Sequence, residues 1–265
     1  MSQVLEAPKV GAGGLFDLSG KVAVITGSSR GIGRAIAERM AEQGARVVIS
    51  SRKAGPCEEV ANHINDKRPG HAIAVPANIS SKEDLQRLMD ETRKAFGKID
   101  VLVCNAASNP YYGSQLEIGD DAFRKILENN IIANNWMIQM VVPEMRERKD
   151  GAIVIVSSIG GLRGSEVIGA YCISKAADMQ LARNLARELG PDNIRVNCVA
   201  PGLVKTDFAR ALWDSPAGEE RASSGASLRR LGEPDDLAGA AVYLASRAGA
   251  WTTGQTIVVD GGTVC

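Results

Sequence analysis

The chain has 265 residues, of which 45% are hydrophobic, and its 31 Lys and Arg balance its 31 Asp and Glu. This length suits one large globular domain, and the balanced charge gives no electrostatic reason to expect nucleic acid or an anionic membrane surface as a partner. No apolar run approaches the roughly 18 residues of a transmembrane helix. Five cysteines without a C-x-x-C pair and only two histidines lead us to expect a reducing, cytoplasmic location and no metal site.

The first residues, 1–17, are Gly-rich and aperiodic. They predict a flexible N-terminal arm, with the folded domain over 18–265. The arm lacks the basic start and apolar core of a secretory signal, which also favours a cytoplasmic protein.

A nucleotide-binding β-α-β unit is predicted directly after the arm. Lys21–Thr26 (KVAVIT) has the continuous apolar character of a strand buried on both faces. The glycine turn Gly27–Gly33 opens a helix expected over Ile32–Gln43, and Arg46–Ser50 (RVVIS) is a second strand. In such a unit the glycines permit tight backbone geometry, and the bare N–H groups at the start of the helix hold a pyrophosphate.

The end of the second strand bears on the choice between NADP and NAD. A reader of the ribose 2′-hydroxyl would be Asp or Glu, and Ser50–Lys53 (SSRK) contains neither. Arg52, with Arg30 and Ser51, suits a 2′-phosphate because a guanidinium forks onto phosphate oxygens. We therefore favour NADP(H), while NAD(H) stays possible because Arg52 could also be a solvated loop charge.

The middle of the chain continues the alternation. Ala72–Pro76 and Val101–Asn105 are expected strands, and Lys82–Phe96 is an expected helix between them. The small residues after Asn105 would let a cofactor ring approach, and the tyrosines of the next loop either line a substrate mouth or pack on the surface. A long helix is expected over Asp121–Arg148, kinked or restarted near Pro143. Its asparagines are read as polar helix surface, unless one of them does chemistry: Asn129, Asn130, Asn134 and Asn135.

The most informative stretch is 152–175. Ala152–Val156 is a buried-type strand, and Ser157 and Ser158 follow where it ends. The next helix, Ala170–Leu189, carries Tyr171 and Lys175, which share one face because they are four residues apart. An ammonium beside a phenol favours the phenolate and lowers the phenol's pKa. Ser158 could donate a hydrogen bond to a substrate oxygen at the same place.

The C-terminal part completes the predicted fold. A sixth strand is expected over Ile194–Ala200, and a short mobile helix over Leu203–Asp214 leads into a polar loop over 215–227, together the best lid candidate. A capped helix over Glu233–Ser246 precedes a last strand over Gln255–Asp260. The alternation predicts an α/β fold: a single Rossmann-type, doubly wound domain with a seven-stranded parallel sheet and helices on both faces.

Taken together and in order, these motifs resemble the short-chain dehydrogenase/reductase family over roughly residues 18 to 262. Thr26–Gly33 resembles its TGxxxGxG turn, and Asn105-Ala106-Ala107 resembles its NAG motif with Ala in place of Gly. Ser158, Tyr171 and Lys175 match the family's Ser and YxxxK positions. Other segments are similar to NADP-dependent carbonyl reductases of the dehydrogenase/reductase member 4 type and to bacterial 3-oxoacyl reductases.

The resemblance implies roles for particular residues. Tyr171 would be the general acid or base, Lys175 would lower its pKa, and Ser158 would polarise the carbonyl. Asn130 would hold a water that relays protons from Lys175, with neighbouring Asn129 as the other candidate. The implied cofactor-binding residues are Gly27, Ser29, Arg30, Ile32, Gly33, Ser51, Arg52, Asn78, Ile79, Asn105, Ala106, Tyr171, Lys175, Pro201, Gly202, Val204 and Thr206.

The sequence thus predicts a carbonyl reductase-like oxidoreductase that transfers a hydride between NADP(H) and a moderately apolar ketone or secondary alcohol. The expected substrate pocket consists of Ile159, Val167, Phe208, Leu212 and Trp213. The alternatives are an NAD(H)-dependent secondary alcohol dehydrogenase and a catalytically idle nucleotide-binding redox sensor. The resemblance further implies a homotetramer, with the helices that begin near Asp121 and Ala170 at the interface.

Overall fold

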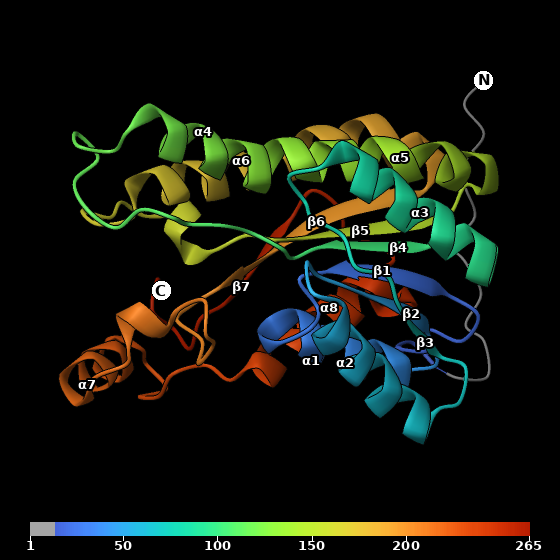
Figure 1. Cartoon of the computed structure of the whole chain (residues 1–265), viewed down its shortest axis with the longest axis horizontal. Coiled ribbons are helices and arrows are strands. Elements are labelled where there is room, and N and C mark those ends of the chain that lie inside the picture. Colours follow the sequence, from blue (N-terminus) through green and yellow to red (C-terminus); the bar gives the residue numbers. More distant parts are fainter. Residues whose placement is uncertain (1–13) are drawn as a thin grey trace.

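The computed structural model describes residues 14–265 and places a parallel sheet of seven strands at their centre. The strand order is β3-β2-β1-β4-β5-β6-β7 (Figure 1). The strands are β1 (Val22–Thr26), β2 (Arg46–Ser50), β3 (Ala72–Ala74), β4 (Val101–Cys104), β5 (Gly151–Val156), β6 (Ile194–Pro201) and β7 (Thr256–Val259). The predicted α/β class and parallel seven-stranded sheet are confirmed.

Helices cover both faces of this sheet. One layer contains α1, α2 and α8, and the other contains α3, α5 and α6 (Figure 1). The α-helices are α1 (Gly31–Glu42), α2 (Ala54–Lys67), α3 (Lys82–Phe96), α4 (Asp120–Leu127), α5 (Ala133–Arg148), α6 (Gly169–Leu189), α7 (Pro216–Gly225) and α8 (Pro234–Ala245). Because β1, β2, β4, β5 and β6 are buried almost throughout, their sequences are runs of apolar residues rather than alternating patterns.

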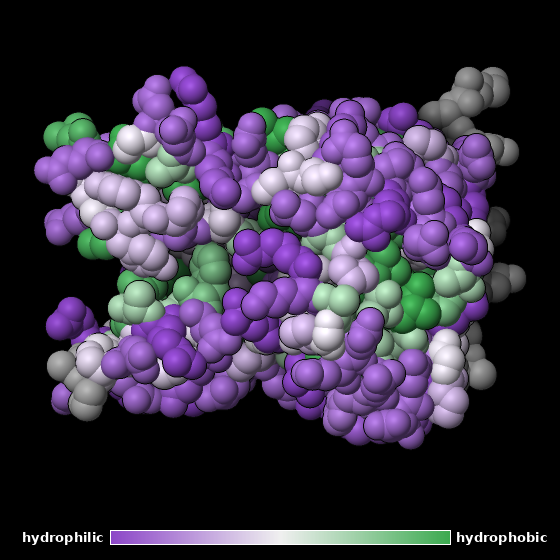
Figure 2. Space-filling view, viewed as in Figure 1, coloured by the Kyte–Doolittle hydropathy of each residue, from purple (hydrophilic) through white to green (hydrophobic). Residues whose placement is uncertain are grey.

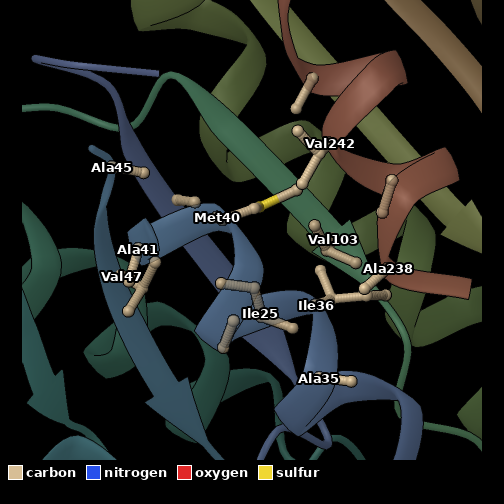
Figure 3. Close-up of a cluster of buried hydrophobic side chains, with 14 of the residues drawn as sticks. Ile25, Ala35, Ile36, Met40, Ala41, Ala45, Val47, Val103, Ala238 and Val242 are labelled. Atoms are coloured by element: carbon tan, nitrogen blue, oxygen red, sulfur yellow. The ribbon is translucent and has the colours of Figure 1, made fainter. Parts of the chain in front are cut away.

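The core between the sheet and the first layer fixes the start of α1. Ile36 and Met40 of α1 pack toward Ala238 and Val242 of α8, over the face of the sheet that carries Ile25 (Figure 3). These side chains are at most 5% exposed. Burial of this kind stabilises by roughly 25 cal/mol per Å² of apolar surface. The packing holds α1, and with it the glycine turn, against the ends of β1 and β4.

The strand order places the site. The chain winds outward in one direction from β1 to β3 and in the other from β4 to β7, so the order reverses between β1 and β4. In open parallel sheets the crevice for a ligand lies at the carboxyl ends of the strands at such a reversal. The glycine turn after β1, Asn105 after β4 and Ser158 after β5 all follow strands at this edge.

Three predicted elements differ from the structure. The helix expected over Asp121–Arg148 consists of α4, a π-helical turn (Glu128–Ile132) and α5, which continues through Pro143. The segment expected as a short helix at Leu203–Asp214 has only a 3-10 turn at Arg210–Leu212. The loop expected over 215–227 instead contains α7, which begins where the Ser215 side chain accepts a hydrogen bond from the N–H of Gly218.

The predicted division at residue 18 stays a prediction, since most of the arm, residues 1–13, lies outside the described residues.

Candidate active site

The glycine turn is held in place by Asn105. The Asn105 amide nitrogen donates to the carbonyl oxygens of Thr26 at 2.8 Å and Gly27 at 3.2 Å. A Cβ added to Gly33 would lie 2.4 Å from that nitrogen, so this position has room for glycine only. Gly27 and Gly31 have φ angles of +65° and +56°, which also favour glycine.

The start of α1 is suited to an anion. Its N-cap residue, Arg30, makes no capping hydrogen bond through its side chain. The first N–H groups of α1 therefore have no side-chain partner from that residue, and they carry the positive end of the helix dipole. A pyrophosphate fits this arrangement.

The two serines after β5 have different surroundings. Ser157 is buried and donates its hydroxyl to the carbonyl oxygen of Lys175 at 2.7 Å, which ties β5 to α6. Ser158 accepts a hydrogen bond from the N–H of Gly160 at 3.0 Å. Its hydroxyl also faces the Tyr171 phenol, so a substrate oxygen between the two could accept hydrogen bonds from both.

Tyr171 and Lys175 lie together on α6, as their spacing predicts. The Lys175 ammonium is 5.7 Å from the centroid of the Tyr171 ring. Lys175 is only 2% exposed, and its ammonium donates to the Val156 carbonyl oxygen at 2.8 Å and to Asp178 at 3.0 Å. Its charge is thus held close behind the phenol.

The pKa of Tyr171 differs from the sequence-based expectation. Burial raises the pKa of the phenol above its ordinary value of 10.0, and this effect outweighs the ammonium of Lys175, which lowers it. A hydrogen bond with Ser158 also lowers the pKa, while the charge of Asp178 raises it. The effect of Lys175 thus has the expected sign, but the net shift of the Tyr171 pKa is upward, opposite to the expected lowered pKa.

The asparagines of the long helix are mostly not helix surface. Asn129, Asn130 and Asn134 are at most 5% exposed, so their interpretation as surface residues is wrong. Asn130 donates to the Ser108 carbonyl oxygen at 3.1 Å and to the Ser174 hydroxyl at 3.0 Å. Ser174 in turn donates to the Tyr171 carbonyl oxygen at 2.7 Å. Asn130 thus supports the turn of α6 that carries Tyr171.

One cavity of about 880 Å³ joins the glycine turn to Tyr171, within the usual size range of ligand pockets. Every residue predicted to bind the cofactor lines it, and so does Ser158. Asn130 does not line it, whereas Asn129 does. Of the two loop tyrosines, Tyr112 lines the cavity, as one of the two alternatives predicted. The sequence reasoning missed further lining residues: Lys125, Ile168, Lys205 and Asp207.

The segment after β6 lies over this cavity. Asp207 pairs with Arg30 of the glycine turn at 2.8 Å, and Thr206 packs against Gly31. The ring of Phe208 is 6.0 Å from that of Tyr171, centroid to centroid. Residues 203–209 and Leu212 line the cavity, so the lid position agrees with the prediction for this part of the chain.

The wall near Tyr171 is largely apolar. Phe208 and Leu212 line the cavity as predicted, but Ile159, Val167 and Trp213 do not. Tyr112 and Ile168 line it in their place. Figure 2 shows a hollow, with hydrophobic residues in it, between the part of the molecule formed by α4 and α6 and the part formed by α7.

Fold and site together define a dinucleotide-dependent oxidoreductase with a Ser, Tyr and Lys constellation. A family model described as enoyl-(acyl carrier protein) reductase matches residues 27–264. The chain belongs to the short-chain dehydrogenase/reductase family and is an NAD(P)-dependent oxidoreductase.

Named relatives agree with this assignment. The chain is 43% identical to the human protein "Dehydrogenase/reductase SDR family member 4" over 93% of this chain and 88% of that one. For the Caenorhabditis elegans protein of that name the identity is 38%, over 92% and 95% of the two chains. A gluconate 5-dehydrogenase from Burkholderia cenocepacia J2315, solved in complex with NADP and tartrate, is 30% identical with a TM-score of 0.89, over 96% and 98% of the chains. Within residues 14–265, every helix is too short or too polar to cross a bilayer.

Proposed function

We propose that this chain is an NADP(H)-dependent carbonyl reductase that interconverts moderately apolar ketones and secondary alcohols, with Tyr171 as the general acid or base. The observation that carries the proposal is the single cavity in which the glycine turn and the Tyr171 side chain are both exposed. A dinucleotide held at the start of α1 would have its reactive end beside Tyr171 and Ser158.

When bound, the dinucleotide supplies or accepts the hydride. In reduction, Tyr171 donates its phenolic proton to the substrate oxygen, and Ser158 donates a second hydrogen bond to the same oxygen. The ammonium of Lys175 stabilises the phenolate that remains. In oxidation the same phenolate removes the proton from the alcohol. Proton transfer by a positioned group of this kind contributes about 10²–10⁴-fold to the rate.

The first test replaces the phenol. Tyr171→Phe should lower the turnover number at least about 100-fold on any ketone that the wild type reduces. The matched control is Tyr243→Phe, because the Tyr243 hydroxyl bonds to Thr252 and does not line the cavity. Near-normal turnover by Tyr171→Phe would refute the assigned role.

The preference for NADP(H) is supported by Arg52. This side chain lines the cavity, is exposed, and forms no ion pair or hydrogen bond with other residues of the described part of the chain. Arg30, in contrast, is already paired with Asp207. The unpaired guanidinium of Arg52 could therefore bind a 2′-phosphate. No carboxylate directly after β2 would repel that phosphate.

The cofactor test compares NADPH with NADH. Arg52→Ala should raise the KM for NADPH at least about 10-fold, the effect of losing one charge-assisted hydrogen bond, and leave the KM for NADH nearly unchanged. Arg34→Ala is the matched control, because Arg34 pairs with Glu38 on the surface of α1 and does not line the cavity. Unchanged NADPH affinity in Arg52→Ala would exclude this residue as the 2′-phosphate reader.

The substrate class follows from the wall beside Tyr171. Phe208, Leu212 and Ile168 offer apolar surface there, so burial of a hydrocarbon group would stabilise the bound ketone. We expect aryl and alicyclic ketones to be reduced with higher kcat/KM than sugar-acid substrates such as the oxidised form of gluconate. A preference for the sugar acid would refute this class while leaving the role of Tyr171 intact.

We further propose a homotetramer, supported by two exposed apolar side chains on the predicted interface helices. Ile132 and Ile173 are 40% and 48% exposed. Sedimentation of the wild type should give the mass of four chains, and Ile173→Asp should reduce it. The cytoplasmic location stays a prediction.

A further inference from the structure

A buried carboxylate lies next to the proposed catalytic lysine. Asp178 is one helical turn after Lys175 on α6 and is 0% exposed. Its Oδ2 accepts from the Lys175 ammonium at 3.0 Å. Buried ion pairs contribute little to stability compared with apolar residues of the same volume, because both charges lose their hydration. The position of this pair therefore calls for an explanation other than stability.

A third residue completes the arrangement from a different helix. Asn134 of α5 donates one amide hydrogen to Asp178 Oδ1 at 3.1 Å and contacts the Asn130 carbonyl oxygen at 2.6 Å. The Lys175 ammonium is thus fixed from two sides, by the Val156 carbonyl oxygen at the end of β5 and by Asp178. Two of its three N–H donors are taken.

The charges oppose one another at Tyr171. The positive charge of Lys175 favours the phenolate, and the negative charge of Asp178 disfavours it. Asp178 also raises the pKa of Lys175 and so keeps the ammonium protonated despite its burial. The other titratable groups around Asp178 are Cys198 of β6, whose sulfur lies 3.5 Å from the Asp178 carbonyl oxygen, and Cys104 of β4. Burial keeps both thiols neutral, so they contribute no charge.

We propose that Asp178, oriented by Asn134, is a positioning residue that fixes the charged Lys175 ammonium behind Tyr171. The inference rests on the proposed function for its catalytic meaning. The coupling of Asp178 to Tyr171 through Lys175 is independent of the substrate. Without Asp178, the buried lysine would lose both its partner and its charge.

The direct test is the tyrosinate absorbance of the free protein. The absorbance is recorded after a rapid pH jump, before the protein unfolds. The absorbance of the wild type minus that of Tyr171→Phe, plotted against pH, gives the titration curve of Tyr171. The same difference is then taken between Asp178→Asn and the double variant Asp178→Asn/Tyr171→Phe. The midpoint should rise in Asp178→Asn, because the buried lysine loses the charge partner that keeps it protonated and no longer favours the tyrosinate. A midpoint that stays the same or falls overturns the proposal.

The kinetic readout must move in the same direction. In alcohol oxidation, the pH at which kcat reaches half of its maximum should rise in Asp178→Asn. Glu188→Gln is the matched control, since Glu188 lies on the same helix, pairs with Arg146 at the surface, and should change neither titration nor profile. If the wild type turns over no ketone or alcohol, the proposed function fails, but the absorbance titration still decides whether Asp178 is coupled to Tyr171.

A second variant separates charge from folding. Asp178→Leu also removes the carboxylate, replaces it with an apolar side chain, and should raise the Tyr171 midpoint as Asp178→Asn does. If both variants fail to fold, Asp178 is needed for the fold itself and the positioning role is overturned.

Discussion

Gly161 brings the serine loop, residues 157–161, against α6, and its replacement gives the sharpest single test of the site's geometry. A Cβ added at Gly161 would lie 2.7 Å from the carbonyl carbon of Lys175 and 2.8 Å from the nitrogen of Ala176. Both are backbone atoms of α6, so no side-chain rotation relieves the overlap. In Gly161→Ala, either the 3-10 turn at Ile159–Gly161 or this part of α6 must move.

The cost follows from the packing. Forcing an extra carbon into a well-packed interior costs about 1–3 kcal/mol. The gain from replacing glycine, about 0.4–1 kcal/mol through the unfolded state, offsets only part of it. We expect a net destabilisation of about 1–2 kcal/mol, which for a chain of this size lowers Tm by several degrees at about 2–4 °C per kcal/mol. The segments that must move carry Ser158 and Lys175. The turnover number should therefore fall by more than the loss of folded protein alone explains.

Thermal unfolding and ketone reduction, measured on the same preparation, check both parts. Gly164→Ala is the matched control, because a Cβ at Gly164 meets nothing within 4 Å and its φ is not positive. The control should keep wild-type Tm and kcat. If Gly161→Ala matches the wild type in both measurements, the close approach of the serine loop to α6 is not what positions Ser158 against Tyr171.

Three further predictions concern other parts of the chain. Gly33→Ala should abolish NADPH binding, measured by fluorescence titration, because its Cβ would lie 2.4 Å from the Asn105 amide, whereas Gly239→Ala, with open space around it, should bind normally. Arg230 and the N–H of Glu233 hold the pKa of Asp236 at about 2, below its ordinary 3.8, so its contribution to stability is present above about pH 4 and is lost as the pH falls toward 2. Asp236→Asn should therefore lower the free energy of unfolding at pH 7 by about 1 kcal/mol and by less at pH 2.5; an equal loss at both values would contradict the capping role. Iodoacetamide should modify only Cys265 in the native protein, since Cys57, Cys104, Cys172 and Cys198 are buried and burial raises the pKa of Cys198 to about 12; modification of any of these four at a comparable rate would refute this.

The strands could be predicted because each depends on a local pattern. A strand buried on both faces must be a short apolar run, and KVAVIT, RVVIS and AIVIV are such runs between turn residues. Parallel strands then place their following loops at one edge, so the cofactor residues could be expected in one cavity before any geometry was known. The spacing of four residues indicated that Tyr171 and Lys175 share one face of a helix, although that spacing alone is weak evidence for a site.

The missed features depend on packing between segments far apart in sequence. Asp178 shares the face of Lys175, which its spacing indicates, but its burial follows from α5 and β6 packing over it. The π-helical turn at Glu128–Ile132 places one extra residue in the helix, and Asn129 and Asn130 are both buried there. The substrate wall was partly missed, and the choice between the two alternatives for Tyr112 stayed open, because Tyr112 and Ile168 come from loops whose conformation the sequence pattern does not specify.

The contacts also differ between the two sides of the site. On the catalytic side, Lys175, Asp178 and Asn134 are at most 2% exposed and bond to one another and to backbone atoms. On the lid side, the side chains of Arg30 and Asp207 are 69% and 47% exposed, and surface pairs of this kind contribute at most about 1 kcal/mol. Breaking this surface pair therefore costs little, whereas moving the lysine would leave a buried charge without a partner. Substitutions in Phe208 and Leu212 should accordingly change which ketones are accepted, without changing the pH dependence that the buried side imposes on Tyr171.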